Sequence, residues 1–365
     1  MKLLTRFLNY CMSIKKNYIC GTPFASLEVH DNANFLCCPT WLTKHLPSKS
    51  NVGESWNSDE ANDIRDSILD GSYRYCDSLH CPMLHQLETF GDVGKIYPLY
   101  HKDRLPEELK TKIEQYKNGT LTPSIIQFSF DRTCNLECPS CRVKLFTADK
   151  KKIEEVEATI DDIESIYGGS VTLLYITGSG DPFISVGFRN FLRNFDKSKW
   201  PKLKHIHLHT NATKWNKAMW ESMKEIHPYV TSCEISIDAA TKDTYENKTR
   251  IGGKWDELIE NLKFISTIPK LQRIKPSFVV QQRNYKEMKL FYDLMISIFG
   301  NKANVYYGKI TNWGTFSNDE YLTHQIWNPN HDEYDDFITE VNKTFPAEQC
   351  WHNLQEFITQ HKSLI

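Results

Sequence analysis

The chain has 365 residues, of which 40% are hydrophobic, enough for one large α/β domain with a smaller one beside it. Its 44 basic and 46 acidic side chains give a net charge of −2, so composition supplies no electrostatic argument for nucleic-acid binding. No apolar run approaches the ~20 residues that span a bilayer, and Arg6 and Asn9 interrupt the N-terminal stretch, so we expect neither a membrane span nor a signal peptide.

Cysteine usage indicates metal binding rather than disulfides. The chain contains eleven cysteines, an odd number in a long sequence without a recognisable signal peptide. Disulfide frameworks belong to oxidising compartments and to small secreted domains. We therefore expect a cytoplasmic protein whose thiolates bind metal.

The first 100 residues are predicted to form a small, loop-rich module. Residues 27–29 and 35–39 suggest two short strands around a turn, and apolar residues at helical spacing predict a helix over 59–70. A segment that buries so little apolar area usually needs an additional cross-link to be stable, and a bound metal can provide one. Four thiolates would suit a closed iron–sulfur cluster or a four-cysteine zinc site. The candidate ligands are Cys20, Cys37 or Cys38, Cys76 and Cys81.

Residues 101–122 are predicted to be a linker. They are rich in charged side chains and contain Pro106 and the turn Asn118-Gly119. Residues 107–116 are expected to form a surface helix within it, whose charges face solvent.

Three cysteines follow the first strand of the next segment. Alternating apolar residues predict a strand over 125–130, and Cys134, Cys138 and Cys141 then stand in a C-x-x-x-C-x-x-C spacing. Three thiolates suit a cluster with one open iron, because the missing fourth cysteine leaves a coordination position. The alternatives are a zinc site that lacks its fourth ligand nearby and thiols that only pack.

From residue 123 to 315, strands and helices alternate. The predicted strands are 125–130, 171–176, 203–209, 229–237, 276–281 and 303–310. The predicted helices are 149–167, 186–195, 214–226, 255–268 and 285–299. This alternation predicts an α/β fold with a parallel sheet and right-handed crossovers. Residues 316–365 are expected to add two helices that cover the substrate or the open side of the sheet.

Candidate binding residues follow the second predicted strand. Gly178 and Gly180 would let the backbone approach a ligand closely, with Ser179 between them. Asp181 adds a carboxylate that suits an ammonium group. In α/β barrels, chemistry collects in such loops at the carboxyl ends of strands.

Further polar residues lie at the ends of later strands. Ser236 and Asp238 end the fourth strand, and Arg250 follows it; an arginine fork is suited to binding a carboxylate. Asn284, after the fifth strand, is expected to face a substrate. One row of histidines shares a face of the third strand, and packing is the favoured interpretation over metal binding. The row consists of His205, His207 and His209.

The segment Cys-Asn-Leu-Glu-Cys-Pro-Ser-Cys after a strand resembles the signature of radical S-adenosylmethionine (SAM) enzymes. The resemblance implies a partial (β/α)6 TIM-like barrel. It also implies a 4Fe–4S cluster on Cys134, Cys138 and Cys141, with SAM on the fourth iron. Reduction in that family cleaves SAM to a 5′-deoxyadenosyl radical, which abstracts hydrogen from the substrate. Ser140 departs from the aromatic residue that often precedes the last cysteine.

The later motifs extend this resemblance. Residues 178–181 are similar to the Gly-Gly-Glu motif that binds the SAM amino group, with Ser179 and Asp181 in place of the usual Gly and Glu. By analogy, Ser236 and Arg250 contact the SAM carboxylate, while Asp238 binds a ribose hydroxyl or the substrate. Thr210-Asn211-Ala212 is similar to the family's Thr-Asn-Gly turn.

The N-terminal cysteines resemble the SPASM or twitch module of the same family, which holds an auxiliary 4Fe–4S cluster. The similar features are the Asp31-Asn32 turn before Cys37-Cys38, the start of a helix at Trp56-Asn57-Ser58, and Cys81-Pro82. The module usually follows the barrel, whereas here it precedes it. The expected domains are the module at 1–100, the linker at 101–122, the barrel at 123–315 and the helical cover at 316–365.

The resemblance implies an enzyme that modifies or oxidises a peptide or protein. An oxidoreductase or epimerase of a sugar or small metabolite is the alternative within the family, and a non-catalytic zinc or iron–sulfur binding module is the alternative outside it. The expected partners are a reductase or flavodoxin-type electron donor and a peptide or small-molecule substrate.

Overall fold

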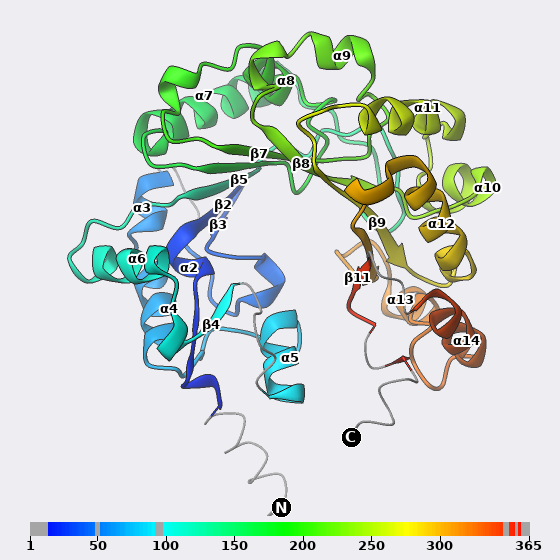
Figure 1. Ribbon diagram of the computed structural model, residues 1–365, viewed down its shortest axis with the longest axis horizontal. Helices are drawn as coiled ribbons and strands as arrows, with labels where there is room; N and C mark the ends of the chain where they lie inside the picture. Colours follow the sequence, from blue (N-terminus) through cyan, green and yellow to red (C-terminus); the bar gives the residue numbers. More distant parts are fainter. Residues whose placement is uncertain (1–13, 48–51, 92–97, 346–349, 355–356, 359–365) are drawn as a thin grey trace, which may run out of the picture. The chain divides into compact units, whose positions relative to one another are not determined.

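The computed structural model describes residues 14–47, 52–91, 98–345, 350–354 and 357–358 (Figure 1). The N-terminal stretch that contains Arg6 and Asn9 lies outside these residues. The chain divides into two compact units. Unit 1 consists of Met1–Asp131, Ala158–Tyr175 and Asp196–Lys204, and unit 2 of Arg132–Glu157, Ile176–Phe195 and His205–Ile365.

The strands and helices follow one another along the chain. The strands are β1 (Tyr18–Cys20), β2 (Ser26–His30), β3 (Asn34–Phe35), β4 (Leu99–His101), β5 (Ile125–Ser129), β6 (Leu173–Ile176), β7 (His205–Thr210), β8 (Val230–Ser236), β9 (Arg273–Val280), β10 (Val305–Lys309) and β11 (Cys350–His352). The helices are α2 (Thr22–Ala25), α3 (Val52–Trp56), α4 (Asp59–Leu69), α5 (Pro82–Phe90), α6 (Glu107–Lys117), α7 (Lys150–Tyr167), α8 (Val186–Arg193), α9 (Lys217–Glu221), α10 (Lys242–Thr244), α11 (Trp255–Ser266), α12 (Met288–Phe299), α13 (Asn318–His324) and α14 (Tyr334–Thr344).

The main sheet runs in the order β11-β10-β9-β8-β7-β6-β5-β2-β3. Its first eight strands are parallel and β3 is antiparallel to β2, so the predicted α/β class with a parallel partial-barrel sheet is confirmed. The expectation of six strands is corrected, because β2 and β11 extend the sheet. In β2, Leu27 lies opposite Ile126 and Val29 opposite Phe128, and all four side chains are buried. β11 has three residues, too few for a readable alternation.

Most predicted helices of the α/β region are present at nearly the predicted positions. The exception is the helix predicted over 214–226, where α9 ends after Glu221 and a 3₁₀ turn covers Lys224–Ile226. Asn216 caps α9 by accepting from the Met219 N–H at 2.9 Å. The Ser222 hydroxyl at its other end donates to the Met219 carbonyl at 2.7 Å. Such local side-chain bonds compete with helix propagation and explain why the segment is broken.

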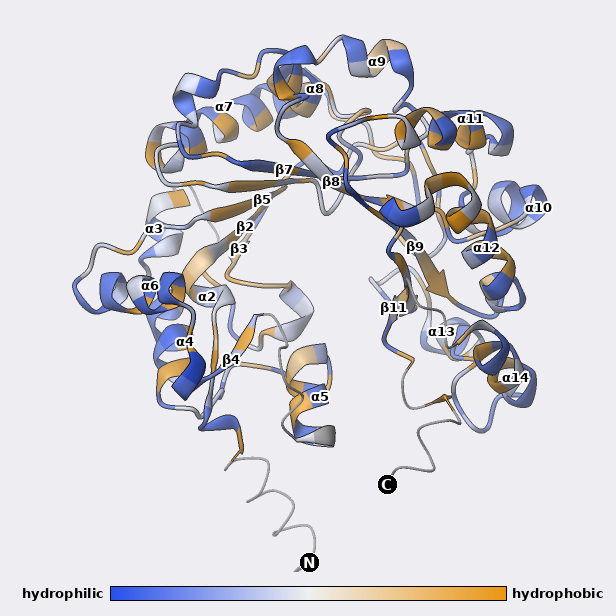
Figure 2. Cartoon of the chain, viewed as in Figure 1, coloured by the Kyte–Doolittle hydropathy of each residue, from blue (hydrophilic) through white to orange (hydrophobic). Residues whose placement is uncertain are grey.

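The strands of unit 2 have one apolar face and one polar face. Leu208, Ile235 and Phe278 are fully buried on the apolar face, where the Phe278 ring lies 4.9 Å from that of Phe291 on α12. Figure 1 shows α11 and α12 alongside strands β8 and β9. In Figure 2, apolar residues colour much of β5 and β9, whereas helices such as α6 and α10 are largely hydrophilic. This arrangement leaves the polar face of the strands on the side away from α12.

Unit 1 is organised around a buried arginine. Arg65 on α4 is 1% exposed and lies over the Trp56 ring at 4.3 Å. Its guanidinium donates to the carbonyls of Pro23 at 2.9 Å and Trp56 at 2.8 Å. These bonds join α2, the end of α3 and α4. A buried arginine whose N–H groups are hydrogen-bonded thus links three helices of this unit.

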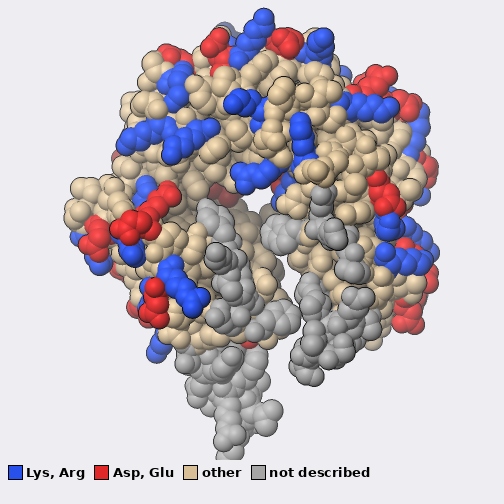
Figure 3. Space-filling view, in the orientation of Figure 1, with Lys and Arg blue, Asp and Glu red and all other residues tan. Residues whose placement is uncertain are grey.

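Basic and acidic side chains are interspersed on the molecular face in Figure 3. This agrees with the net charge of −2. In the described part of the chain, no helix combines the length and the apolar character needed to span a membrane.

Candidate functional site

The loop after β5 carries the cysteine triad (Cys134, Cys138 and Cys141). Cys134 is 9% exposed and Cys138 is 4% exposed, and both pack against the fully buried Leu136. Cys141 is exposed. The loop therefore presents two thiols from a buried position and one from the surface.

Three other loops of unit 2 hold this loop in place. The Thr133 carbonyl accepts from the Asp181 N–H at 2.9 Å, which ties it to the loop after β6. The Asn135 side chain donates to the Thr213 hydroxyl at 3.0 Å, which ties it to the loop after β7. The Glu137 N–H donates to the Ile251 carbonyl at 2.9 Å. The triad is thus fixed to segments that follow β6, β7 and β8, at the carboxyl ends where parallel strands collect functional groups.

Each triad sulfur meets one side-chain N–H donor. Asn211 Nδ2 donates to Cys134 Sγ at 3.5 Å, Arg250 Nη1 to Cys138 Sγ at 3.5 Å, and Arg142 Nη2 to Cys141 Sγ at 3.5 Å. Arg142 is further fixed by its Nη1, which donates to the Arg132 carbonyl at 3.0 Å. Two of the three donors are cations, so they partly offset the burial that disfavours negatively charged sulfur.

The protonation of the buried thiols reflects the same arrangement. Burial and the neighbouring Asp181 carboxylate raise the pKa of Cys134 to about 11. Burial also raises the pKa of Cys138, against the opposing effect of the Arg250 cation. Burial lowers the pKa of Arg142, but the charges of all three triad thiols raise it by more. Without metal these buried thiols are neutral, so metal binding would release their protons.

The loop of residues 177–181 presents its backbone more than its carboxylate. Gly178 is exposed, and Ser179 and Gly180 are half-buried. Asp181 is 1% exposed and accepts three hydrogen bonds, from the Thr210 hydroxyl at 2.7 Å, the Asn211 N–H at 2.8 Å and the Phe183 N–H at 2.9 Å. Binding of an ammonium by Asp181 stays a prediction. In the structure its carboxylate joins the loops after β6 and β7.

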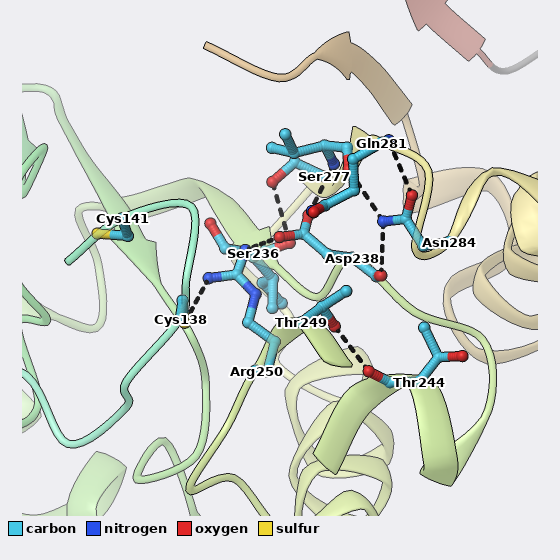
Figure 4. Close-up of polar contacts among 12 residues, drawn as sticks. Cys138, Cys141, Ser236, Asp238, Thr244, Thr249, Arg250, Ser277, Gln281 and Asn284 are labelled. Atoms are coloured by element: carbon cyan, nitrogen blue, oxygen red, sulfur yellow. Dashed lines mark hydrogen bonds and ion pairs between the residues drawn. The ribbon is translucent and has the colours of Figure 1, made fainter. Parts of the chain in front are cut away.

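Arg250 lies between the triad and the end of β8 (Figure 4). Its Nη2 forms an ion pair with Asp238 Oδ2 at 2.6 Å, with side-chain exposures of 12% and 2%. Asp238 has φ of +59°, in the left-handed region, and its Oδ1 accepts from the Val279 N–H at 2.7 Å. Burial raises the pKa of Asp238, and the Arg250 cation opposes that rise. The two predicted binding residues are therefore paired with each other.

Two buried polar atoms near this pair have no hydrogen-bond partner. They are the hydroxyl of Tyr245, a fully buried side chain, and Nε of Arg250. The charges of Arg250 and Cys138 both act on the Tyr245 hydroxyl. Orphan buried donors usually have a partner in the occupied site, so these two atoms fit a site that receives an electron-rich group.

Ser236 and Asn284 are both expected to contact a bound ligand, and the structure shows the partners of each. The Ser236 hydroxyl lies 3.0 Å from His209 Nε2, and its contact with SAM stays a prediction. The expectation that Asn284 faces a substrate is wrong. Asn284 is 2% exposed, its Nδ2 donates to the carbonyls of Asp238 at 3.0 Å and Val279 at 2.9 Å, and its Oδ1 accepts from the Gln281 N–H at 3.0 Å. It fixes the backbone of Asp238 instead.

Hydroxyl partners account for the histidine row of β7. His205 lies 3.0 Å from the Thr231 hydroxyl and His207 lies 2.8 Å from the Ser232 hydroxyl. Burial lowers the pKa of His207 to about 3, so this imidazole stays neutral at physiological pH. These contacts across the strands agree with the packing interpretation.

In unit 1, four cysteines make up the predicted second site, the N-terminal set (Cys20, Cys37, Cys76 and Cys81). Cys20 ends β1, and Cys81 precedes α5, where the Met83 and Leu84 N–H groups face its sulfur. Cys76 is anchored by an antiparallel bridge to Leu42. Burial, partly offset by these N–H groups, raises the pKa of Cys81 to about 11.

The structure distinguishes Cys37 from Cys38. Burial raises the pKa of Cys37 well above its usual value, and the charges of Cys20, Cys76, Cys81 and Cys38 add to that rise. Cys38 Sγ instead lies 3.3 Å from the Thr40 hydroxyl. The charge of Cys37 thus interacts with those of Cys20, Cys76 and Cys81, while Cys38 interacts with Cys81 and contacts Thr40.

The two thiol sites differ in their number of cysteines, with three in the triad and four in the N-terminal set. Within the described residues, no group of three or more His, Cys, Asp and Glu side chains could hold one metal ion. A single zinc ion needs every sulfur at about 2.3 Å from one point. An iron–sulfur cluster distributes its cysteines over several irons, so more widely spaced sulfurs can bind it. The numbers of cysteines agree with the expectation of an open-iron cluster at the triad and a closed cluster at the N-terminal set, and both stay predictions.

Sequence reasoning missed two parts of the triad site. Arg142 directly follows Cys141 in the sequence, and this position could have predicted that its guanidinium lies next to the triad. Asn211 was noticed as part of a turn, but its bond to Cys134 depends on how two loops meet. Ala212 in the same turn has φ of +59°, which agrees with a position where the similar family motif has glycine.

Comparisons with known proteins give one family and several distant structures. The family described as the Radical SAM superfamily matches residues 128–268. No protein of curated function matches the sequence. Similar solved structures include SuiB of Streptococcus suis bound to precursor peptide SuiA, with 15% identity and a TM-score of 0.46 over 79% of this chain and 63% of that chain.

Two further structures are similar at comparable identity. One is anSMEcpe with bound AdoMet, with 16% identity and a TM-score of 0.41 over 60% of this chain and 58% of that chain. The other is TYW1 with a lysine–pyruvate adduct bound, with 14% identity and a TM-score of 0.35 over 66% of this chain and 77% of that chain. The chain thus spans less than two thirds of SuiB and of anSMEcpe.

Proposed function

Because residues 128–268 form a domain of the radical SAM superfamily, we propose that this chain cleaves S-adenosylmethionine reductively and directs the resulting radical to a polar substrate. One observation carries the proposal. The three cysteines of the family-like loop lie within the matched residues, and each sulfur meets its own side-chain N–H donor.

The triad would hold the 4Fe–4S cluster that the family requires. When bound, this cluster and SAM supply the one-electron cleavage that yields a 5′-deoxyadenosyl radical. The chain's own residues would hold the reactants in place. Gly178 and Gly180 let the backbone approach SAM, and the unpartnered Arg250 Nε and Tyr245 hydroxyl are available to an electron-rich group.

We propose that the N-terminal set binds an auxiliary 4Fe–4S cluster through Cys20, Cys37, Cys76 and Cys81. The mutual influence of these four thiols supports Cys37 over Cys38 as the ligand. Four cysteine ligands leave no open iron, so such a cluster is suited to electron transfer or structure rather than to SAM. Low-potential clusters and free thiolates also need reducing surroundings, which supports a cytoplasmic location.

The polar face of the unit 2 strands supports a polar substrate. Lys275 Nζ pairs with Glu234 Oε2 at 2.9 Å and lies 4.2 Å from the Tyr306 ring centre. Burial raises the pKa of Glu234, but the neighbouring His209 and Lys275 lower it by more, to about 2. Glu234 therefore stays ionised at neutral pH. A face with fixed charges and hydroxyls suits a peptide or a polar small molecule better than a hydrocarbon.

The proposal is tested by product formation under anaerobic conditions. Reconstituted protein, dithionite and SAM should yield 5′-deoxyadenosine, and Cys138→Ala should abolish it. A mass change on a peptide would favour peptide modification. A small molecule oxidised by two electrons would favour the metabolite alternative, with a reductase or flavodoxin-type protein as the natural electron donor in either case. Wild-type protein that binds iron but forms no 5′-deoxyadenosine would contradict the proposal.

A further inference from the structure

The triad sulfurs receive hydrogen bonds of two kinds, and this difference has a chemical consequence. Cys138 and Cys141 each accept from an arginine, whereas Cys134 accepts from the neutral amide of Asn211. N–H donors and positive charge next to a cluster stabilise the more negative, reduced form, and hydrogen bonding to the sulfurs is one of the levers that set a cluster's potential. All three donors therefore act in the same direction.

The two arginines differ in how their charge is balanced. Arg250 is paired with Asp238 at 2.6 Å, so the cation and carboxylate largely cancel at a distance (Figure 4). No carboxylate pairs with Arg142 in the parts of the chain that the structure describes, and the charges of all three triad cysteines act on its guanidinium. Its two hydrogen bonds, to Cys141 Sγ and to the Arg132 carbonyl, fix its position beside the triad. Arg142 thus supplies the uncompensated positive charge.

We propose that Arg142 is a positioning residue that raises the reduction potential of the triad's cluster, with Asn211 making a smaller contribution through its neutral N–H bond to Cys134. This inference rests on the proposed function, because it requires a cluster at the triad. It makes the cluster easier to reduce by an external one-electron donor: one electron passes from the donor to the cluster, and no bond in the chain is made or broken.

The test is a potentiometric titration of the reconstituted full-length chain, with dithionite as reductant. The electron paramagnetic resonance signal that changes when SAM is added reports the triad cluster separately from any auxiliary one. Arg142→Ala should make the midpoint more negative. At a fixed potential, the ratio of reduced to oxidised cluster should fall at least tenfold, which corresponds to 59 mV for one electron. Asn211→Ala should produce a smaller shift in the same direction.

Arg132→Ala is the matched control, because it removes the same charge from an exposed residue whose backbone carbonyl remains available to Arg142. Its midpoint should stay close to the wild-type value. If Arg142→Ala fails to hold its cluster, Arg142→Gln decides the question, since it keeps an N–H group and removes only the charge. It should also shift the midpoint to more negative values.

Two outcomes have different meanings. If Arg142→Ala holds its full iron content and has the same midpoint as Arg132→Ala, the inference is overturned while the proposed function stays intact. If the alanine variant holds no cluster, the same comparison is made with Arg142→Gln. Wild-type protein with no SAM-sensitive signal would instead overturn the proposed function on which the inference rests.

Discussion

The two cysteine sites present different hydrogen-bond donors to their sulfur atoms. At the triad, two arginines and an asparagine donate to sulfur through side chains. At the N-terminal set, the polar groups that face sulfur are mainly backbone N–H groups, at Cys20 and Cys81, with a hydroxyl from Thr22. The interaction energy of a cationic donor changes strongly when the charge of the metal group changes. The interaction energy of a backbone N–H dipole changes less.

This difference suggests a division of roles. The triad has one exposed cysteine and three ligands, so it suits a group that meets SAM and changes its charge. The N-terminal set has four thiols in a small unit with a buried arginine, so it suits a group that also stabilises the fold. The predictions below test this contrast, from the largest expected effect to the smallest.

Removing a triad thiol should give the largest effect. Cys138→Ala should lower the iron content of reconstituted protein by about four atoms per chain and abolish 5′-deoxyadenosine formation, because two cysteines do not hold the cluster. Iron and sulfide analysis measures the first effect and chromatography the second. Cys233→Ala is the control, since Cys233 is fully buried inside β8 and belongs to neither cysteine set, so its iron content should equal that of wild type. Equal losses in the two variants would argue against the triad.

Removing Cys37 or Cys38 should show which of these two adjacent cysteines is the metal ligand. Cys37→Ala should also lose about four irons, but the SAM-sensitive signal of the triad should remain, since the two sites use separate ligands. Cys38→Ala should keep the full iron content because Cys38 Sγ contacts Thr40 instead. The opposite pattern would make Cys38 the ligand.

Breaking the buried ion pair should affect stability as well as the site. Asp238→Asn leaves the buried Arg250 cation without its carboxylate, which should reduce the free energy of unfolding by about 3–5 kcal/mol. Asp293→Asn removes the same charge from the exposed Lys289–Asp293 pair on α12 and should cost less than about 1 kcal/mol. Anaerobic urea unfolding compares the two. A cost for Asp238→Asn as small as that of the control would show that Arg250 is not held by this pair.

The smallest predicted effect concerns the turn beside the triad. Ala212→Gly relieves a positive φ that costs an L-residue about 1–2 kcal/mol, less the extra entropy of glycine in the unfolded chain. The net gain in unfolding free energy should be on the order of 0.5 kcal/mol. Ala158→Gly, at an exposed position in the interior of α7, should instead destabilise by roughly 0.5–1 kcal/mol. Destabilisation by both substitutions would contradict the assigned backbone geometry.

The sequence predicted those parts of the molecule that depend on local periodicity and spacing. The strands and helices from β5 to β10, the helix α4 and the two C-terminal helices follow from alternation and apolar spacing, and the triad follows from its spacing after a strand. The pairing of β2 with β5 could not be predicted, because a strand's partner is decided by tertiary contacts. The break after α9 was missed for a related reason, since caps and local side-chain bonds override apolar spacing.

At the site, residue types were easier to predict than partners. Asp238 and Arg250 were singled out as separate ligand contacts, but they form an ion pair with each other. Asp181 was chosen for its carboxylate, yet three hydrogen bonds from its own chain surround it. These partners come from loops distant in sequence, so no local pattern encodes them.

The measurement that tests the account most directly is the iron, sulfide and zinc content of the wild-type chain after anaerobic reconstitution. The account predicts about eight irons and about eight sulfides per chain without zinc, corresponding to one 4Fe–4S cluster at the triad and another at the N-terminal set. About four irons with one zinc would keep the radical chemistry and make the N-terminal site structural. Zinc without iron would contradict the central claim and leave a metal-binding module without radical chemistry.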